Sequence, residues 1–446
     1  MSVQHHLKQA VQHHLAGETT LAEQGLRVLL QAAPKTADAW HLLGVFALHR
    51  GAFASAVALL REAIGCQAGA ADFHFNLGGG LFSLERWAEA ADAYRRATEL
   101  DSEFAEAWKG LGASELKLRR WAKAMVALQK SLDCDAHQPA VALQLAEACE
   151  ELDRDPEAFA AARHALALEP YSAEGHRRMA SLYGRKGDQL NQATAFYNVG
   201  ESLRREQRTS EAIAALEEAL RLHPAHGKAA HALACLTGRT PCTAPRDYVV
   251  DLFNGYADRF DAHLEQLEYR VPELLRAALG RLLPPGRQAG RVLDLGCGSG
   301  RGGALFRDLA TELSGVDLAP RMIDTARQRG VYDTLWVGDV REVSRTNPGP
   351  YQLLLATDVF IYVGALEEVF AEAARLCAPG GWFAFSVEEG ASGYVLRESG
   401  RFAHAATYWK KLAENNDFAV VVDEAIPIRL HEGQPIPGRL GVLQRL

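Results

Sequence analysis

The chain has 446 residues, which is long enough for two or three domains. Its 48 Lys and Arg residues stand against 56 Asp and Glu residues, giving a formal net charge of −8, and 48% of the residues are hydrophobic. This composition is typical of a folded protein and argues against one that holds a nucleic-acid backbone through overall positive charge. We therefore expect no nucleic-acid partner.

The seven cysteines lie far apart and form no C-x-x-C pair. Neither a disulfide framework nor a zinc site is expected from them. The amino-terminal segment lacks the basic and apolar regions of a secretory signal, and no run of about 18 apolar residues occurs. We expect a cytoplasmic protein with no metal site and no membrane association.

A period of 34 residues runs through the first half of the chain. One column of the repeat contains Leu43, Leu77, Leu111 and Leu145, and the next contains Gly44, Gly78, Gly112 and Ala146. Small residues at a fixed position let the two helices of each unit approach closely, while larger apolar side chains fill the space between units. Between Ala173 and Gln192 the register slips, and a lone helix is expected there.

These columns resemble the tetratricopeptide repeat, which implies an all-α superhelix over residues 1–238. The resemblance further implies a concave groove that binds a protein or peptide. The groove would present Val45, Leu48, Phe75, Phe82, Lys109, Lys117, Glu147 and Glu150. The same aromatic side chains could instead pack inside the superhelix or against the second domain. A homodimer formed through the repeats is the other partner considered.

Residues 239–247 are rich in Gly, Pro and Thr and are predicted to form a linker to a second domain, residues 248–446. From Arg291 onward, short apolar runs alternate with helical stretches. This pattern predicts an α/β domain with a doubly wound, Rossmann-like parallel sheet. Five runs are expected as buried strands, and two late runs, FAVVVDEAIPIRL and GRLGVLQRL, as a hairpin-like pair that closes the sheet.

A glycine-rich turn, D-L-G-C-G-S-G, follows the first expected strand, and acidic residues stand at the ends of the next two. The third glycine of a dinucleotide-binding G-x-G-x-x-G turn is replaced here by Arg301. Asp294, Asp317 and Asp339 suit a ligand that has no phosphate but carries an amine, a ribose diol and an adenine amino group. Singly, each acid could instead cap a helix or satisfy turn amides. Jointly, they favour S-adenosylmethionine.

Residues 245–446 resemble class I S-adenosylmethionine-dependent methyltransferases, and the whole chain resembles bacterial methyltransferases fused to tetratricopeptide repeats. The resemblance implies that S-adenosylmethionine binds and leaves as S-adenosylhomocysteine. The cofactor-binding residues that it implies are Tyr248, Phe253, Tyr256 and Phe260 in a lid; Asp294, Gly296, Cys297, Gly298 and Gly300 in the turn; Asp317, Leu318, Met322, Asp339 and Val340 around the adenosine; and Thr357, Asp358 and Val359 at the methyl-donor end.

Methyl transfer from a sulfonium is a direct displacement, so the protein must mainly hold a nucleophile about 3 Å from the methyl carbon in a site closed to water. A base is useful only where the acceptor has to lose a proton. His404 is favoured as that base, since histidine titrates near neutral pH, although it could equally cap or pack a helix. The predicted catalytic residues are His404, Tyr362 and Glu388, and the predicted substrate-binding residues are Glu389, Tyr394 and Arg401.

The acceptor is expected to be a protein or peptide recruited by the repeats. The alternative is a small molecule or glycan, because the second half also resembles small-molecule N-methyltransferases; the repeats would then serve oligomerisation or scaffolding. An interaction protein that binds the cofactor with little catalysis, and a nicotinamide-dependent oxidoreductase, are the two further hypotheses.

Overall fold

The computed structural model describes residues 3–283, 286, 288–431 and 433–446. The chain divides into two compact units, residues 1–208 and 209–446. Within the described residues, each helix is too short or too polar to cross a membrane.

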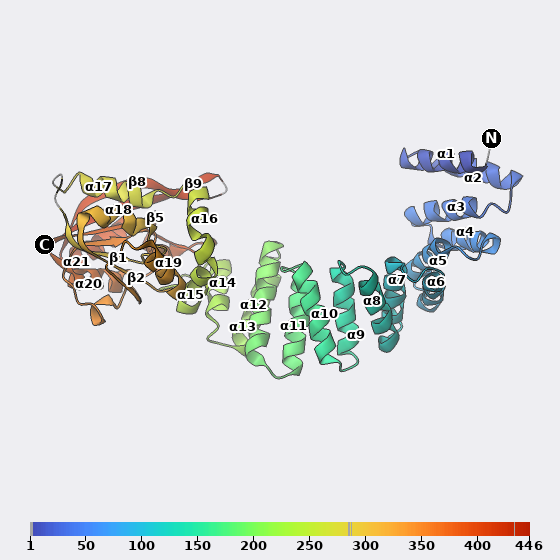
Figure 1. The fold of residues 1–446 in the computed structure, drawn as a ribbon, viewed down its shortest axis with the longest axis horizontal. Coiled ribbons are helices and arrows are strands. Elements are labelled where there is room, and N and C mark those ends of the chain that lie inside the picture. Colours follow the sequence, from blue (N-terminus) through green and yellow to red (C-terminus); the bar gives the residue numbers. More distant parts are fainter. Residues whose placement is uncertain (1–2, 284–285, 287, 432) are drawn as a thin grey trace. The chain divides into compact units, whose positions relative to one another are not determined.

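The first unit is built from antiparallel helices that stack in sequence order (Figure 1). Its helices are α1 (Val3–Leu15), α2 (Thr19–Ala32), α3 (Ala37–His49), α4 (Phe53–Cys66), α5 (Ala71–Ser83), α6 (Trp87–Leu100), α7 (Ala105–Lys117), α8 (Trp121–Cys134), α9 (Pro139–Glu150), α10 (Asp155–Leu168), α11 (Ala173–Arg185) and α12 (Gln189–Arg205).

The turn between the two helices of each pair recurs with the period seen in the sequence. One residue in each turn has a left-handed backbone, with φ between +53° and +80°, at Gly17, Gly51, Glu85, Arg119, Asp153 and Gly187. The series continues through Gly187, and α11 packs against α12 as the sixth pair. The lone helix expected between Ala173 and Gln192 is therefore wrong, but the expected slip in register is observed, because the next left-handed turn residue is Gln207, 20 positions after Gly187. The period of 34 residues between left-handed turn residues thus ends at Gly187.

The glycine column of the repeat marks close contact between paired helices. A Cβ added to Gly44 would lie 2.6 Å from Leu60 Cγ, and one added to Gly112 would lie 2.6 Å from the Leu128 side chain. Gly78 faces the Tyr94 ring at 2.8 Å in the same way. Each close approach buries the facing side chain, which is why these positions exclude larger residues.

The aromatic residues expected in the groove make contacts within the repeats. The Phe75 ring lies 4.8 Å from that of Phe104, and the Phe82 ring lies 4.7 Å from that of Trp87. Both side chains are only partly buried. They therefore contribute to packing between helices while part of each surface stays open to solvent.

The second unit contains two helices and then an α/β fold. Its elements are α13 (Thr209–Leu222), α14 (Gly227–Thr237), α15 (Arg246–Tyr256), η1 (Ala257–Arg259), α16 (Phe260–Gln266), α17 (Val271–Gly280), β1 (Gly290–Leu295), α18 (Arg301–Phe306), η2 (Arg307–Leu309), β2 (Ala310–Asp317), α19 (Pro320–Arg329), β3 (Thr334–Val337), η3 (Val343–Arg345), β4 (Tyr351–Ala356), η4 (Phe360–Tyr362), α20 (Glu367–Leu376), β5 (Cys377–Glu389), β6 (Tyr394–Leu396), β7 (Phe402–His404), α21 (Ala406–Asn415), β8 (Phe418–His431) and β9 (Gln434–Arg445).

The sheet has the strand order β3-β2-β1-β4-β5, with parallel pairing throughout that series. The chain reverses its direction of winding between β1 and β4, and ligands of such sheets bind outside the carboxyl ends of the strands at this point. β9 pairs antiparallel with both β5 and β8, which confirms the late pair. The predicted all-α repeats followed by a Rossmann-like α/β domain are confirmed.

Helices pack on both faces of the sheet. One apolar core joins the sheet to α20 and α21 through residues such as Phe370 and Trp409. The other joins it to α17 and α18 through residues such as Leu275 and Phe306. The short strands β6 and β7 extend the sheet beyond β5 and were not expected from the sequence.

Candidate functional site

A cavity of about 440 Å³ lies at the carboxyl ends of β1, β2, β3 and β4. The glycine turn, the strand-end acids and the lid helices contribute to its walls. The sequence-predicted residues that line it are Phe253, Tyr256, Phe260, Gly296, Cys297, Gly298, Asp317, Leu318, Asp339, Val340, Thr357, Asp358, Val359, Tyr362 and Arg401.

The glycine turn after β1 has the backbone that its sequence requires. Gly296, Gly298 and Gly300 have φ values of +69°, +54° and +82°, a region that L side chains rarely adopt. A Cβ added to Gly296 would lie 2.5 Å from Cγ2 of Val359, which follows β4. The turn therefore packs directly against the end of the neighbouring strand, and its backbone forms one wall of the cavity.

Asp317, the last residue of β2, is tied to this turn. Its two carboxylate oxygens accept hydrogen bonds from the amides of Gly298, at 2.9 Å, and Ala319, at 2.8 Å. Burial raises the pKa of Asp317, and these amide bonds oppose the rise. Each carboxylate oxygen has more than one acceptor direction, so the group can still accept from a ligand.

Asp294 lies in β1 beneath the turn and does not line the cavity. It accepts a 2.7 Å hydrogen bond from the Tyr332 hydroxyl. Burial raises the pKa of Asp294 to about 7, while the Tyr332 bond opposes the rise. Asp294 therefore supports the turn from below and can influence a ligand only through the backbone or at short range.

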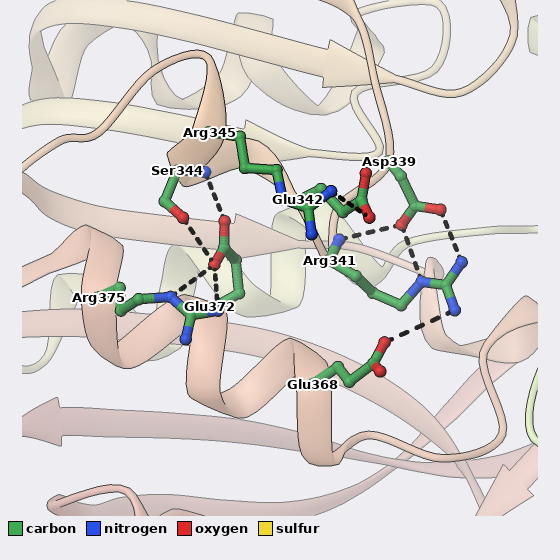
Figure 2. A network of polar contacts seen from close by, with 8 residues as sticks. All are labelled: Asp339, Arg341, Glu342, Ser344, Arg345, Glu368, Glu372 and Arg375. Atoms are coloured by element: carbon green, nitrogen blue, oxygen red, sulfur yellow. Dashed lines mark hydrogen bonds and ion pairs between the residues drawn. The ribbon is translucent and has the colours of Figure 1, made fainter.

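Asp339, two residues beyond β3, is held by an arginine on its own loop (Figure 2). Arg341 donates from Nε to Oδ1 at 2.9 Å and from Nη2 to Oδ2 at 2.7 Å. Burial acts in the other direction, but these hydrogen bonds hold the pKa of Asp339 below its usual value. Figure 2 shows Arg341 extending from Asp339 to Glu368 on α20. The acid is thus ionised and fixed in place beside the cavity.

The lid is formed by α15 and α16, which supply Phe253, Tyr256 and Phe260. The Phe260 ring lies 5.8 Å from that of Tyr256 and 5.9 Å from that of Phe253. Asp261 accepts a 2.5 Å hydrogen bond from Ser299 in the glycine turn. The aromatic cluster is therefore anchored to the cavity wall that it covers.

At the end of β4, Asp358 is part of a buried ion-pair cluster. Its φ is +57°, and its carboxylate accepts from Arg429 Nη1 at 3.1 and 2.9 Å. Arg429 also contacts Glu388, which is paired in turn with Arg397 at 3.2 Å. Burial raises the pKa of Glu388, and Arg429 opposes the rise. Two carboxylates are therefore neutralised by arginines next to the cavity.

Several residues predicted for the site lie outside the cavity wall. Glu388 is buried in the ion-pair cluster, and Glu389 is paired with Arg439 at 2.9 Å. Met322 is fully buried and packs beneath the lid residues Phe253 and Phe260. The remaining members of this group are Tyr248, which stacks near His231; Gly300, which precedes α18; Asp294, described above; Tyr394, which packs near Phe402; and His404.

His404 is fully buried on β7 rather than exposed to the cavity. Its Nε2 lies 2.9 Å from both the Val363 and the Gly364 carbonyl oxygens, so it is the protonated nitrogen of a neutral ring. Nδ1 has no hydrogen-bond partner among the described residues. Burial lowers the pKa of His404 to about 4. Its predicted role as a base stays untested, and this environment favours the alternative, in which it packs and holds the loop after β4.

The segment predicted as a linker contributes to the cavity. Ala244 N donates to Tyr362 O at 3.0 Å, Ala365 N donates to Cys242 O at 2.7 Å, and Thr243 forms an isolated bridge with Val363. Thr243 and Ala244 line the cavity. Sequence reasoning missed this role because nothing in the segment itself identifies its partner strand.

Other lining residues were also missed. Arg429 lies in β8, about 70 positions after Asp358, and its signal was a lone arginine in the apolar run IPIRL. His263 lies on α16, and Tyr269 lies in the segment between α16 and α17; both line the cavity. Arg341 lies two positions after the predicted Asp339 in the sequence. It was missed because its bidentate contact with Asp339 depends on the conformation of the loop.

Family models match both parts of the chain. A model described as a methyltransferase domain matches residues 266–425. Tetratricopeptide-repeat models match residues 16–73, 75–140 and 193–226. The predicted combination of tetratricopeptide repeats with a class I methyltransferase domain is confirmed.

The chain is similar to curated bacterial methyltransferases. It is 28% identical over 153 residues to the malonyl-acyl-carrier-protein O-methyltransferase of Enterobacter lignolyticus, covering 34% of this chain and 58% of that protein. It is 33% identical over 103 residues to the ubiquinone biosynthesis O-methyltransferase of Bordetella pertussis, covering 22% and 42%. A solved SAM-dependent methyltransferase from Methanosarcina mazei matches with 16% identity and a TM-score of 0.32, covering 38% of this chain and 97% of that one. The chain spans about half the length of the two curated relatives.

Proposed function

We propose that this chain, which carries tetratricopeptide repeats and a class I methyltransferase domain, is an S-adenosylmethionine-dependent methyltransferase. The observation that carries the proposal is that Asp317, Asp339 and the glycine turn line one cavity together with the end of β4. We assign residues 1–238 to the repeat domain, 239–247 to a connector and 248–446 to the methyltransferase domain. The repeat match that ends at residue 226 supports this assignment.

The chemistry of the cavity fits S-adenosylmethionine better than a dinucleotide. Asp317 and Asp339 offer carboxylate oxygens, which accept from ribose hydroxyls and from the adenine amino group but would repel a pyrophosphate. The left-handed Gly298 lines the cavity without a side chain, which leaves room for the methionine part. Asp317, Leu318, Asp339 and Val340 would hold the adenosine, and Thr357, Asp358 and Val359 would lie at the donor end.

When bound, S-adenosylmethionine supplies an electrophilic methyl group on a sulfonium. The chain's own residues then have two tasks, which are to orient the acceptor and to exclude water. Tyr256 and Phe260 cover the cavity, and the ion-paired Asp358 keeps the donor end fixed. Tyr362 and Arg401 line the same cavity and are assigned to the acceptor. A residue that removes a proton is needed only for a protonated acceptor.

The proposal is tested by the affinity for S-adenosylhomocysteine, measured by isothermal titration calorimetry. Asp317→Ala removes a charge-assisted acceptor, and we expect a loss of about 1–3 kcal/mol, or roughly 5- to 150-fold. Asp308→Ala is the matched control, because that acid is exposed on η2, pairs with Arg276 of α17 at 2.8 Å and does not line the cavity. If wild-type protein does not bind S-adenosylhomocysteine, or if both variants bind it equally, the proposal fails.

We further propose that the repeats recruit a protein or peptide that presents the methyl acceptor. Lys109 and Lys117 are exposed on α7. The resemblance to the tetratricopeptide repeat implies that these two positions face the groove. Double substitution to Glu should raise KM for a protein acceptor while leaving S-adenosylhomocysteine affinity unchanged. Lys123→Glu and Lys130→Glu on α8 form the control pair.

The competing assignment is O-methylation of a small acceptor, for which the two curated relatives are the support. In that case the repeats serve scaffolding or a homodimer, and the groove variants keep the wild-type KM. Sedimentation analysis of the full chain tests the dimer separately.

A further inference from the structure

Arg401 carries a positive charge at the acceptor side of the cavity that no carboxylate of the described residues neutralises. It is partly buried and lines the cavity beside Tyr362. Burial raises the pKa of Tyr362, and the charge of Arg401 opposes that rise. The charge of Arg401 acts to lower the pKa of Glu388, but Glu388 is already paired with Arg397 and Arg429.

A second donor next to this site is also unsatisfied. Arg429 lines the cavity, is only 3% exposed and uses both terminal nitrogens on Asp358 and Glu388. Its Nε has no hydrogen-bond partner among the described residues. Because this Nε is buried away from the cavity surface, it does not itself contact a ligand, and Arg429 contributes to the site through its charge.

Charge balance points in the same direction. The ion-pair cluster contains two carboxylates, from Asp358 and Glu388, and two guanidinium groups, from Arg397 and Arg429. Arg401 adds a third guanidinium group, which forms no ion pair with the cluster but whose charge acts on Glu388. Counted at full charge, this leaves one positive charge. Placing a cation beside an apolar lid is costly unless a counter-ion accompanies it.

The backbone that carries Arg401 is fixed rather than loose. Arg401 follows the turn between β6 and β7, in which Gly400 N donates to Arg397 O at 2.9 Å and Arg397 N donates to Arg401 O at 2.9 Å. His231 on α14 lies 3.0 Å from the Gly400 carbonyl oxygen through Nε2. Arg397 fastens the same turn to Glu388 and to the Glu389 carbonyl. The guanidinium is therefore presented by a rigid hairpin.

We propose that this site takes a methyl acceptor that bears a carboxylate, held by Arg401 with Arg429 beside it. The inference deepens the proposed function and rests on it. A bound carboxylate satisfies the charge of Arg401, and as an ionised oxygen nucleophile it needs no base. If the carboxylate oxygen itself is the acceptor, an O–CH3 bond forms as the S–CH3 bond breaks; the electron pair of that bond stays on sulfur, and no proton moves. A free acid and an acidic peptide side chain offer the same group.

The test measures binding of matched acid and amide pairs to full-length protein saturated with S-adenosylhomocysteine. Benzoate with benzamide, and octanoate with octanamide, represent free acids. Acetyl-Gly-Glu-Gly-amide with acetyl-Gly-Gln-Gly-amide represents a side-chain carboxylate. We expect at least one acid to bind about tenfold or more tightly than its amide, and the pair that shows the preference identifies the source of the carboxylate.

The variants decide whether Arg401 causes that preference. Arg401→Gln should bring the acid-to-amide ratio close to 1, Arg401→Lys should retain most of it, and the exposed Arg327→Gln should leave it unchanged. Unchanged S-adenosylhomocysteine affinity in Arg401→Gln shows that the variant is folded. Equal binding of all acids and amides to wild type, or a preference that survives in Arg401→Gln, overturns this inference alone. Failure of wild type to bind S-adenosylhomocysteine overturns the proposed function, and this inference with it.

Discussion

Because His404 is buried and neutral, we predict that the stability of the folded chain depends on pH. A histidine that titrates at its ordinary pKa would not give this dependence. Its pKa is about 4 in the folded chain, against an ordinary value of 6.5, because burial disfavours the charged ring. Between those values the unfolded chain binds a proton that the folded chain does not. Stability is therefore complete above pH 6.5 and falls as the pH is lowered toward 4.

The size of the effect follows from the two pKa values. At pH 5 the unfolded chain gains about 2 kcal/mol from protonation of this side chain, whereas at pH 7.5 it gains less than about 0.1 kcal/mol. His404→Gln removes the titrating group, so the stability difference between wild type and variant should shrink by about 2 kcal/mol from pH 7.5 to pH 5.

The assay is urea unfolding read by hydrogen exchange of the segment from β7 to α21, which reports on the second unit alone. His41, His176, His226 and His231 also have lowered pKa values, mainly through burial, and the comparison with His404→Gln cancels their contribution. A stability difference that stays constant with pH refutes the neutral, buried assignment. So does a difference that grows toward low pH.

Two further substitutions test the packing around the cavity. Gly296→Ala should reduce the free energy of unfolding by clearly more than Gly330→Ala. Both glycines have φ of +69°, but only at Gly296 would an added Cβ strike a neighbour, Val359. Equal losses of stability in thermal unfolding would contradict this contact. Arg429→Met should cost about 3–5 kcal/mol in urea unfolding, because it leaves Asp358 without its ion-pair partner and Glu388 with Arg397 alone. Arg276→Met at an outer ion pair should cost less than about 1 kcal/mol, and similar costs for the two variants would argue against the buried cluster.

Much of the fold was readable from the sequence because its signals are local. The repeat columns and the alternation of apolar runs with helices do not depend on distant contacts. The acids at the ends of β2 and β3 could be placed at one edge because parallel strands share their direction. The same rule brought Thr357, after β4, to the cavity.

The rest depends on tertiary contacts that no local pattern encodes. β6 and β7 have three residues each, too few for a period to be visible, and they bury His404. Residues 242–244 of the predicted linker and Arg429 in β8 lie far apart in the sequence, yet both contribute to the region of the cavity. The pairing of α11 with α12 was missed because the side-chain columns diverge after Ala173, and only the left-handed Gly187 marks the turn between these helices.

A crystal structure of the full chain with S-adenosylhomocysteine would show where the cofactor product binds. We expect the adenosine between Asp317 and Asp339, with the sulfur directed toward Thr357 and Val359 beneath the lid. An empty glycine turn in crystals that contain saturating S-adenosylhomocysteine, or a dinucleotide pyrophosphate bound there instead, would contradict it.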